Sequence, residues 1–297
     1  MFILSVGFSY GQSKLWTKVS EEKLGSLEKM ERASVPSVYQ IMHLDLNAFK
    51  QSLVGAPVDT EGAFSNTIVN FPNSKGELSR FRVYEAPIME KGLADRYPDI
   101  KSYAAVGIDD PTVKLRFSVT LFGLHVMSTS GNEGTYYIDT YTKDLNNYIV
   151  YSRKDLYAVR TFACHFQDNH EEIAEQNRSA VENQVLATDG IFRQYRLAMA
   201  CTIEYAAFHV TAAGLGAGTL AQKKAAVLAA MNVTMTRVNG IYERDMSLRM
   251  NLVANNDVII FIDSDSFTNN SASALIGEIR RLLMVLSVLL IMILVIL

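Results

Sequence analysis

The chain has 297 residues, of which 49% are hydrophobic and 20% charged, so it can bury the cores of two ordinary domains. Its formal net charge of −3 gives no reason to expect a nucleic-acid partner, and its basic residues form no stripe that could follow a phosphate backbone. Two cysteines are too few for a disulfide scaffold. We expect a buried apolar thiol at Cys201 and a separate thiol at Cys164, and a single bridge between them stays open as the alternative.

The N-terminus begins with an apolar run over residues 1–8, which is followed by Ser9-Tyr10-Gly11. These three residues have the small-x-small form of a signal-peptidase site, although the run is short and lacks a basic region before it. We therefore expect residues 1–11 to be the remnant of a signal peptide, which implies export. A buried N-terminal strand is the alternative.

Residues 12–160 have the pattern of a β-rich region. A charged stretch over residues 21–32 predicts a helix and residues 38–46 an extended segment. Short alternating runs separated by turn residues then predict strands over residues 78–84, 102–108, 114–122, 124–128, 136–141 and 148–151. Strands at such regular spacing are typical of a β-sandwich or a strongly curved sheet.

Residues 161–192 are polar and without strand signal, which predicts an exposed linker and a site for activating proteolysis. The linker holds a group of side chains of metal-binding type: Cys164, His165, Asp168, His170 and Glu171. Neighbouring residues such as Cys164 and His165 point apart in an extended chain, and His165 and His170 are not one helical turn apart. A solvated chance cluster is therefore favoured over a zinc site.

Residues 193–263 predict a strand, a helix and two further strands. Apolar residues alternate from Tyr195 to Tyr205, which is the pattern of a strand. After a glycine-rich turn, Thr219 and Gln222 form a capping box for an amphipathic helix over about residues 220–244. Residues 248–252 alternate again, residues 255–257 suggest a turn, and residues 258–262 read as a buried strand. The order β-α-β-β predicts a right-handed crossover in an α/β unit.

Three groups of residues in this region carry a family resemblance: residues 195–198, residues 202–205 with Phe208-His209, and residues 237–245 with the run Arg-Val-Asn-Gly-Ile-Tyr-Glu-Arg-Asp. They resemble the opening of the catalytic domain of bacterial reprolysin-like (adamalysin-like) zinc metalloproteases of the metzincin group. The resemblance covers residues 193–278, and the β-rich region resembles the prodomain of such precursors more loosely. It implies an α+β fold overall, in which the first half of an α/β metzincin domain follows a sandwich-like prodomain.

The resemblance also implies an activity. Three histidines of an H-E-x-x-H-x-x-G-x-x-H motif would hold zinc in the intact enzyme, and its glutamate would activate a water that hydrolyses a protein or peptide substrate. This motif is absent from the chain, so no catalytic residue, metal ligand or bound cofactor is assigned to it. A narrower hypothesis gives Cys164 the role of a latency cysteine whose thiolate occupies the open zinc position, although the family's sequence context is missing.

The apolar tail over residues 282–297 allows two interpretations. As a helix it would extend about 24 Å, somewhat less than a hydrocarbon core of about 30 Å. In the first interpretation this apolar helix is a membrane anchor, and the protein is a tail-anchored binding or structural protein of the cell envelope. With suitable codons, however, one base restored after Glu278 gives Asn-Gln-Thr-Val-Ile-Asp-Gly-Val-Ile-Gly-Ser-Ala-Asn-Tyr-Asp-Ile-Gly-His-Ser, which is similar to a metzincin segment before its zinc helix. We favour this second interpretation, in which residues 279–297 are the product of a frameshift.

The remaining candidates favour structural roles. His43, His125 and His209 are isolated in or beside apolar segments, and His209 would be a framework residue near the end of the first catalytic-domain strand. Glu204 is not assigned as a base. Asp263, Asp265 and the Asn269-Asn270 pair lack the spacing of an EF-hand and indicate a polar loop. Gly214, Gly216 and Gly218 lack the spacing of a dinucleotide fingerprint and indicate a plain turn.

Overall fold

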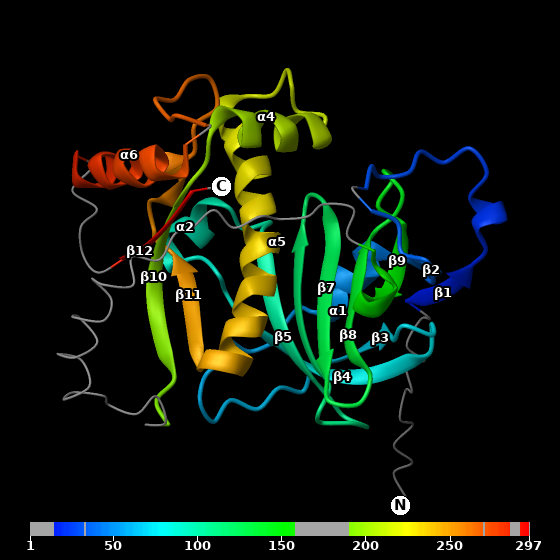
Figure 1. Ribbon diagram of the computed structural model, residues 1–297. Helices are drawn as coiled ribbons and strands as arrows, with labels where there is room; N and C mark the ends of the chain where they lie inside the picture. Colours follow the sequence, from blue (N-terminus) through cyan, green and yellow to red (C-terminus); the bar gives the residue numbers. More distant parts are fainter. Residues whose placement is uncertain (1–14, 33, 158–189, 270, 286–291, 297) are drawn as a thin grey trace, which may run out of the picture.

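The computed structural model describes residues 15–32, 34–157, 190–269, 271–285 and 292–296, and the described chain is α+β. Its larger part is one antiparallel sheet of nine strands in the order β1-β2-β9-β8-β7-β6-β5-β4-β3 (Figure 1). The strands are β1 Trp16–Val19, β2 Gln40–Leu44, β3 Ile68–Pro72, β4 Leu78–Glu85, β5 Lys101–Gly107, β6 Lys114–Thr120, β7 Gly123–Ser130, β8 Gly134–Thr140 and β9 Asn147–Ser152. The six strands predicted from residue 78 onward are confirmed.

The sheet curves until its two edge strands meet. The Trp16 indole of β1 donates a hydrogen bond from Nε1 to the Asn70 carbonyl of β3 at 2.9 Å, and Trp16 is almost fully buried. The short helix α1, Leu46–Ser52, places Phe49 inside the curve against Trp16, Phe71 and Phe117. Of the two predicted arrangements, the strongly curved sheet is thus present and the sandwich is not, because the concave face of this single sheet encloses its own apolar core.

Successive side chains of a strand point to opposite faces, so the two faces of the large sheet carry different kinds of side chain. Phe81, Val83, Phe117, Val126 and Ile138 belong to the concave core. The alternate positions carry polar and long side chains, and this convex face packs on helix α5, Leu220–Met246, mainly through β6 and β7. Figure 1 shows α5 standing between the large sheet and a second, smaller sheet.

The smaller sheet has the order β11-β10-β12, with β10 Arg193–Ala200, β11 Leu248–Leu252 and β12 Met292–Ile296. Both neighbours pair with β10 in parallel, as expected when a helix connects β10 to β11. Helix α5 covers one face of this sheet, and α6, Ala272–Val285, packs Ile279 and Leu283 against Ala198 and Ala200 on the other face.

The larger and smaller parts are joined at the outer edge of β11. The Leu252 N–H donates to the Ile88 carbonyl at 2.7 Å, and the Glu90 N–H donates to the Leu252 carbonyl at 2.8 Å. Leu93 of helix α2, Lys91–Arg96, and Ile100 continue this contact into the core around α5. The segment after β4 therefore covers an edge of the smaller sheet that would otherwise present unpaired backbone groups.

Three expected elements are different in the structure. The strand expected to reach Tyr205 ends at Ala200, and helix α4, Ile203–Ala212, follows it, with Thr202 as N-cap. Asp265 accepts a hydrogen bond from the Ile203 N–H at 2.7 Å, a long-range contact that the local alternation could not indicate.

Residues 258–262 are not a strand, because the 3₁₀ turn Asn256–Ile259 leaves only one parallel bridge, between Cys201 and Ile260. Within the charged stretch 21–32, only Glu21–Leu24 is helical, as a 3₁₀ turn. A second such turn, Arg153–Asp155, follows β9.

Helix α5 confirms the predicted helix and its capping box between Thr219 and Gln222. Its fully buried Asn239 binds the backbone of β11: the amide donates to the Met250 carbonyl at 2.8 Å and accepts from the Met250 N–H at 3.0 Å. Asn256 binds Met199 of β10 in the same two-bond way, at 3.0 and 2.8 Å. Two buried side-chain amides thus complete hydrogen bonds that no neighbouring strand supplies.

Gly240 lets α5 approach the large sheet closely. A Cβ at this position would lie 2.7 Å from Met127 Cε and 2.9 Å from Arg116 Cγ, both on the convex face. We expect Gly240→Ala to lower the free energy of unfolding by about 1 to 2 kcal/mol, despite the better helix propensity of alanine. The control is Gly277→Ala in α6, where a Cβ would meet only Arg281 Nη1 at 3.7 Å. The control should be neutral or stabilising in urea denaturation, and equal destabilisation by both changes would contradict the packing argument.

Candidate functional site

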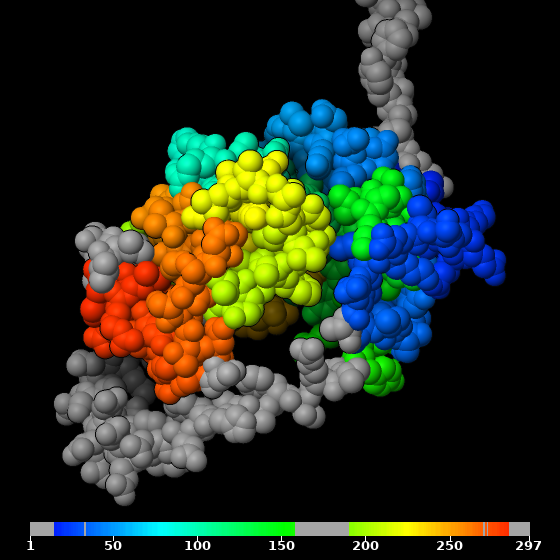
Figure 2. All heavy atoms as spheres, turned by 90° about the horizontal axis from the view of Figure 1, so that it is seen from above, coloured from blue at the N-terminus to red at the C-terminus, as the bar shows by residue number. Residues whose placement is uncertain are grey.

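A cavity of about 670 Å³ lies where the large sheet meets helices α4 and α5. In Figure 2 the surface is hollowed between the yellow-green atoms of these helices and the blue and green atoms of the larger part. The residues lining the cavity come from the N-terminal segment, the β6–β7 turn, β7, the β8–β9 loop and the two helices: Met30, Glu31, Phe122, His125, Lys143, Ala207, Phe208, His209, Thr211, Ala212, Ala230, Val233 and Thr234. Most of them are apolar or aromatic, which is typical of a ligand-binding cavity.

Aromatic rings form one wall of this cavity. The His209 ring of α4 lies 4.4 Å from Tyr205, 5.0 Å from Phe208 and 6.1 Å from Phe122, measured between centroids. Phe208 is 65% exposed, so one large ring stands at the cavity mouth. Burial lowers the pKa of His209, which keeps its imidazole neutral at physiological pH.

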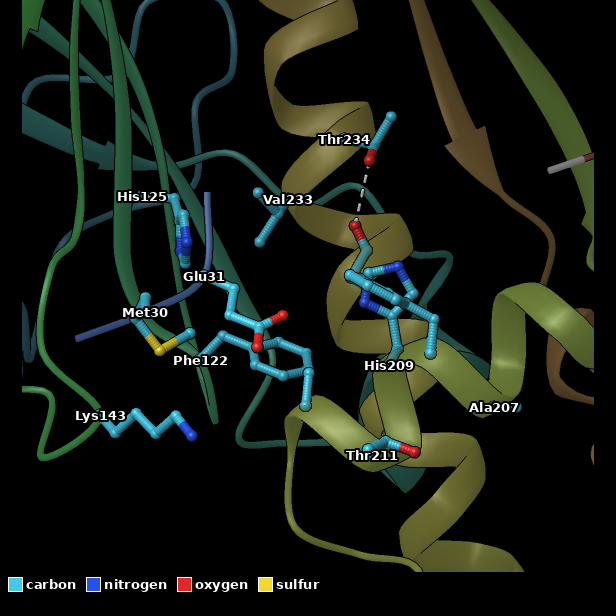
Figure 3. A pocket seen from close by; sticks show the side chains of 13 residues that line it. Met30, Glu31, Phe122, His125, Lys143, Ala207, His209, Thr211, Val233 and Thr234 are labelled. Carbon is cyan, nitrogen blue, oxygen red and sulfur yellow. Dashed lines mark hydrogen bonds between the residues drawn. The ribbon is translucent and has the colours of Figure 1, made fainter. Parts of the chain in front are cut away.

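His125 of β7 lines the opposite side of the cavity (Figure 3). Within the described part of the chain its Nδ1 has no hydrogen-bond partner. Burial lowers the pKa of His125 to about 4; the carboxylate of Asp139 raises it, whereas the charges of Arg237 and Arg32 lower it further. A neutral imidazole with an unpaired nitrogen is therefore held at the cavity wall.

A charged network underlies this wall. Arg237 of α5 donates to Asp139 Oδ1, and the Tyr151 hydroxyl donates to Asp139 Oδ2 at 2.7 Å. Arg32 Nη2 lies 3.8 Å from the same oxygen, and its guanidinium stacks over the Tyr151 ring. Burial alone would raise the pKa of Asp139, but Arg237, with smaller contributions from His125, Tyr151 and Arg32, holds it at about 2. Asp139 is therefore ionised, and both of its carboxylate oxygens accept hydrogen bonds.

The partly buried His125 predicts a loss of stability in mild acid. Because its pKa in the folded state lies below the ordinary value of about 6.5, the unfolded chain takes up the proton first as the pH falls. This stabilisation is complete above about pH 6.5 and is lost between about pH 6.5 and 4, by roughly 3 kcal/mol. Urea denaturation of the wild type and His125→Asn at pH 7 and pH 4.5 should show a shallower pH dependence for the variant. An equal pH dependence of the unfolding free energy in the two proteins would show that His125 does not cause this loss of stability.

Charges at the cavity rim do not balance. Glu31 extends into the cavity from the N-terminal segment in Figure 3, and within the described residues it has no ion-pair partner. Lys143, the cationic side chain of the lining, donates to Glu28 and is thereby neutralised. One uncompensated carboxylate thus remains at the mouth.

The predicted site residues do not meet in this cavity, apart from two histidines. Cys164, His165, Asp168, His170 and Glu171 lie outside the described residues. His43 lies in β2 opposite Asn147 of β9, away from the cavity lining. His209 belongs to helix α4 and not to the end of a strand, which corrects that expectation.

The other sequence candidates have structural roles. Glu204 lies in the first turn of α4, and Asp265 caps that helix from the following loop. Cys201 is a buried thiol, as predicted, and burial raises its pKa to about 11. Gly214, Gly216 and Gly218 form the turn between α4 and α5, as predicted.

In the part of the chain that the structure describes, no three His, Cys, Asp or Glu side chains are grouped so that they could hold a metal ion. No helix of that part is long and apolar enough to cross a membrane. What the cavity offers is a ligand-sized space with aromatic faces, two unprotonated imidazoles and a carboxylate.

Sequence reasoning did not find the cavity, because Glu31, Phe122 and His209 are far apart in the chain and only the packing of α4 brings them together. The Phe208-His209 pair was noticed through the family resemblance alone. No protein-family model matches the sequence, and no curated protein is significantly similar to it.

Proposed function

We propose that this chain is the N-terminal portion of an exported reprolysin-like zinc metalloendopeptidase precursor. Residues 12–160 would form its prodomain, and residues 193–278 the first half of its catalytic domain. The chain as printed lacks the H-E-x-x-H motif, so it should not hydrolyse peptide bonds itself.

The observation that carries this proposal is the unit formed by β10, α5 and β11. It is a parallel strand-helix-strand unit, as the opening of an α/β catalytic domain requires. It contains the first and third groups of residues on which the resemblance depends, and the second group lies on helix α4, between β10 and α5.

The group formed by residues 237–245 lies on α5, and its side chains make the main polar contacts of that helix. Arg237 binds Asp139, Asn239 binds Met250, and Glu243 accepts hydrogen bonds from Arg116 and Arg249. Arg249 also donates to Asp59 at 2.8 Å. Residues that resemble the protease family therefore hold the helix to both sheets, which supports a prodomain that folds together with the catalytic part.

The experiment that tests the proposal starts with the gene. We would sequence independently prepared DNA across the codons for residues 277–297 and about fifty codons beyond, and express both the printed chain and a version with one base restored after Glu278. The restored protein should contain the zinc motif and cleave casein in a reaction that a zinc chelator abolishes, whereas the printed chain should not. A stable reading frame with no motif downstream, or zinc-dependent cleavage by the printed chain, would contradict the proposal.

The alternative is a tail-anchored protein of the cell envelope. It predicts that the full chain partitions with membranes and that a version ending at Glu278 does not. In the structure Ile279 and Leu283 pack against the small sheet within the protein, so this alternative requires α6 to leave that contact. Equal partitioning of the two versions would remove it.

A further inference from the structure

The cavity between the large sheet and helices α4 and α5 has the size and composition of a small-molecule site. Its volume of about 670 Å³ lies within the range of about 300 to 1,000 Å³ that is usual for such sites. Its walls come from parts of the chain that are far apart in sequence, so its shape depends on the complete fold.

We infer that this cavity binds a small organic cation, an ammonium group carried on an aromatic or aliphatic body. The inference is independent of peptidase activity and concerns a surface to which the proposed function gives no role.

Aromatic rings line one wall of the cavity. Phe122 and Phe208 both lie close to His209, at 6.1 and 5.0 Å between ring centroids, and an aromatic face can attract a cation within about 6 Å. Apolar side chains of Met30 and Val233 complete the lining and can contact the body of the ligand.

The rim of the cavity also carries charge. Glu31 points into the cavity and lacks an ion-pair partner within the described chain, whereas Lys143 is bound to Glu28. Below the wall, Arg32 and Arg237 share the single carboxylate of Asp139. A cation placed beside Glu31 would therefore supply the counter-charge that this carboxylate lacks among the described residues.

Hydrogen bonding also favours an ammonium group. The imidazole of His209 lines the cavity and takes part in no side-chain hydrogen bond among the described residues, and burial lowers its pKa. A neutral imidazole can accept a hydrogen bond from an ammonium N–H, whereas a protonated one would repel it. The unpaired Nδ1 of His125 is enclosed in the protein, so we assign this contact to His209.

The test uses calorimetric titration of the full chain with three probes of similar size: 3-phenylpropylammonium, 3-phenylpropanol and benzenesulfonate. We expect the cation to bind about tenfold more tightly than the neutral probe, and the anion not to bind. Glu31→Gln and Phe122→Leu should each weaken the cation about fivefold and leave the neutral probe nearly unchanged. Glu22→Gln and Phe64→Leu, which lie outside the cavity lining, are the matched controls and should change neither affinity.

Failure of the cation to saturate, or equal affinity for the three probes, would overturn the inference. An unchanged cation affinity in Glu31→Gln with an intact melting curve would do the same. A lysine-containing tetrapeptide tests the source of the cation: tighter binding of the peptide than of 3-phenylpropylammonium would overturn the assignment to a small molecule. None of these results depends on whether the restored enzyme cleaves casein.

Discussion

Replacing Asp139 by asparagine should lower the free energy of unfolding by about 3 kcal/mol or more, although the two side chains have almost the same shape. Asp139 is 11% exposed and receives Arg237, Arg32 and the Tyr151 hydroxyl. The change leaves two guanidinium groups near one another without a counter-charge. Arginine cannot lose its proton in response, so the cost cannot be avoided by neutralisation.

The partner variants separate the ion pair from general packing. Arg237→Met should cost less than Asp139→Asn, because Asp139 keeps Arg32 and Tyr151, and the double variant should be more stable than the sum of the single changes predicts. Urea denaturation followed by circular dichroism measures all three. A cost below about 1 kcal/mol for Asp139→Asn, or strict additivity, would show that this network does not stabilise the contact of α5 with the large sheet.

The second large effect is expected at Asn239. Asn239→Leu keeps the volume of the side chain but removes both hydrogen bonds to Met250, leaving a buried N–H and a buried carbonyl unpaired. We expect the free energy of unfolding to fall by about 2 to 4 kcal/mol, because each unsatisfied backbone group costs about 1 to 3 kcal/mol. The loss arises at the outer edge of β11, where the segment around Glu90 also binds Leu252, whereas the inner edge pairs with β10.

The same helix provides the control. Asn232 is also fully buried, but its Nδ2 has no hydrogen-bond partner in the described structure. Asn232→Leu should therefore stay within about 1 kcal/mol of the wild type. Urea denaturation of the two leucine variants compares identical chemistry at two buried positions of one helix. Equal destabilisation would mean that burial of an asparagine, and not its contact with Met250, is what matters.

Both predictions concern the surface by which α5 contacts its neighbours. In the proposed precursor, Arg237 and Glu243 would hold the prodomain, and Asn239 would hold the catalytic sheet. The polar residues of one helix would thus decide whether the two parts fold as a unit. The motif Arg237–Asp245 was noticed as a family resemblance, and the structure gives its residues packing roles that apply whatever the activity is.

Strands and helix starts that depend on residues a few positions apart could be predicted from the amino-acid sequence. Alternation in Phe81 and Val83 predicted a strand with one buried face, and the capping box of Thr219 and Gln222 predicted the start of α5. These signals are local because strand periodicity and helix capping involve residues a few positions apart.

The end of β10, the curvature of the large sheet and the position of α4 depend on contacts between residues far apart in the chain. The strand predicted to reach Tyr205 stops at Ala200, because Asp265, far along the chain, caps the new helix α4. The sheet curves to bring Trp16 to Asn70, and α4 brings His209 to Phe122, neither of which leaves a pattern in neighbouring residues. Long-range hydrogen bonds and packing set these positions. The free energy of such contacts depends on which surfaces of the folded chain meet, and the order of residues within one segment does not reveal this.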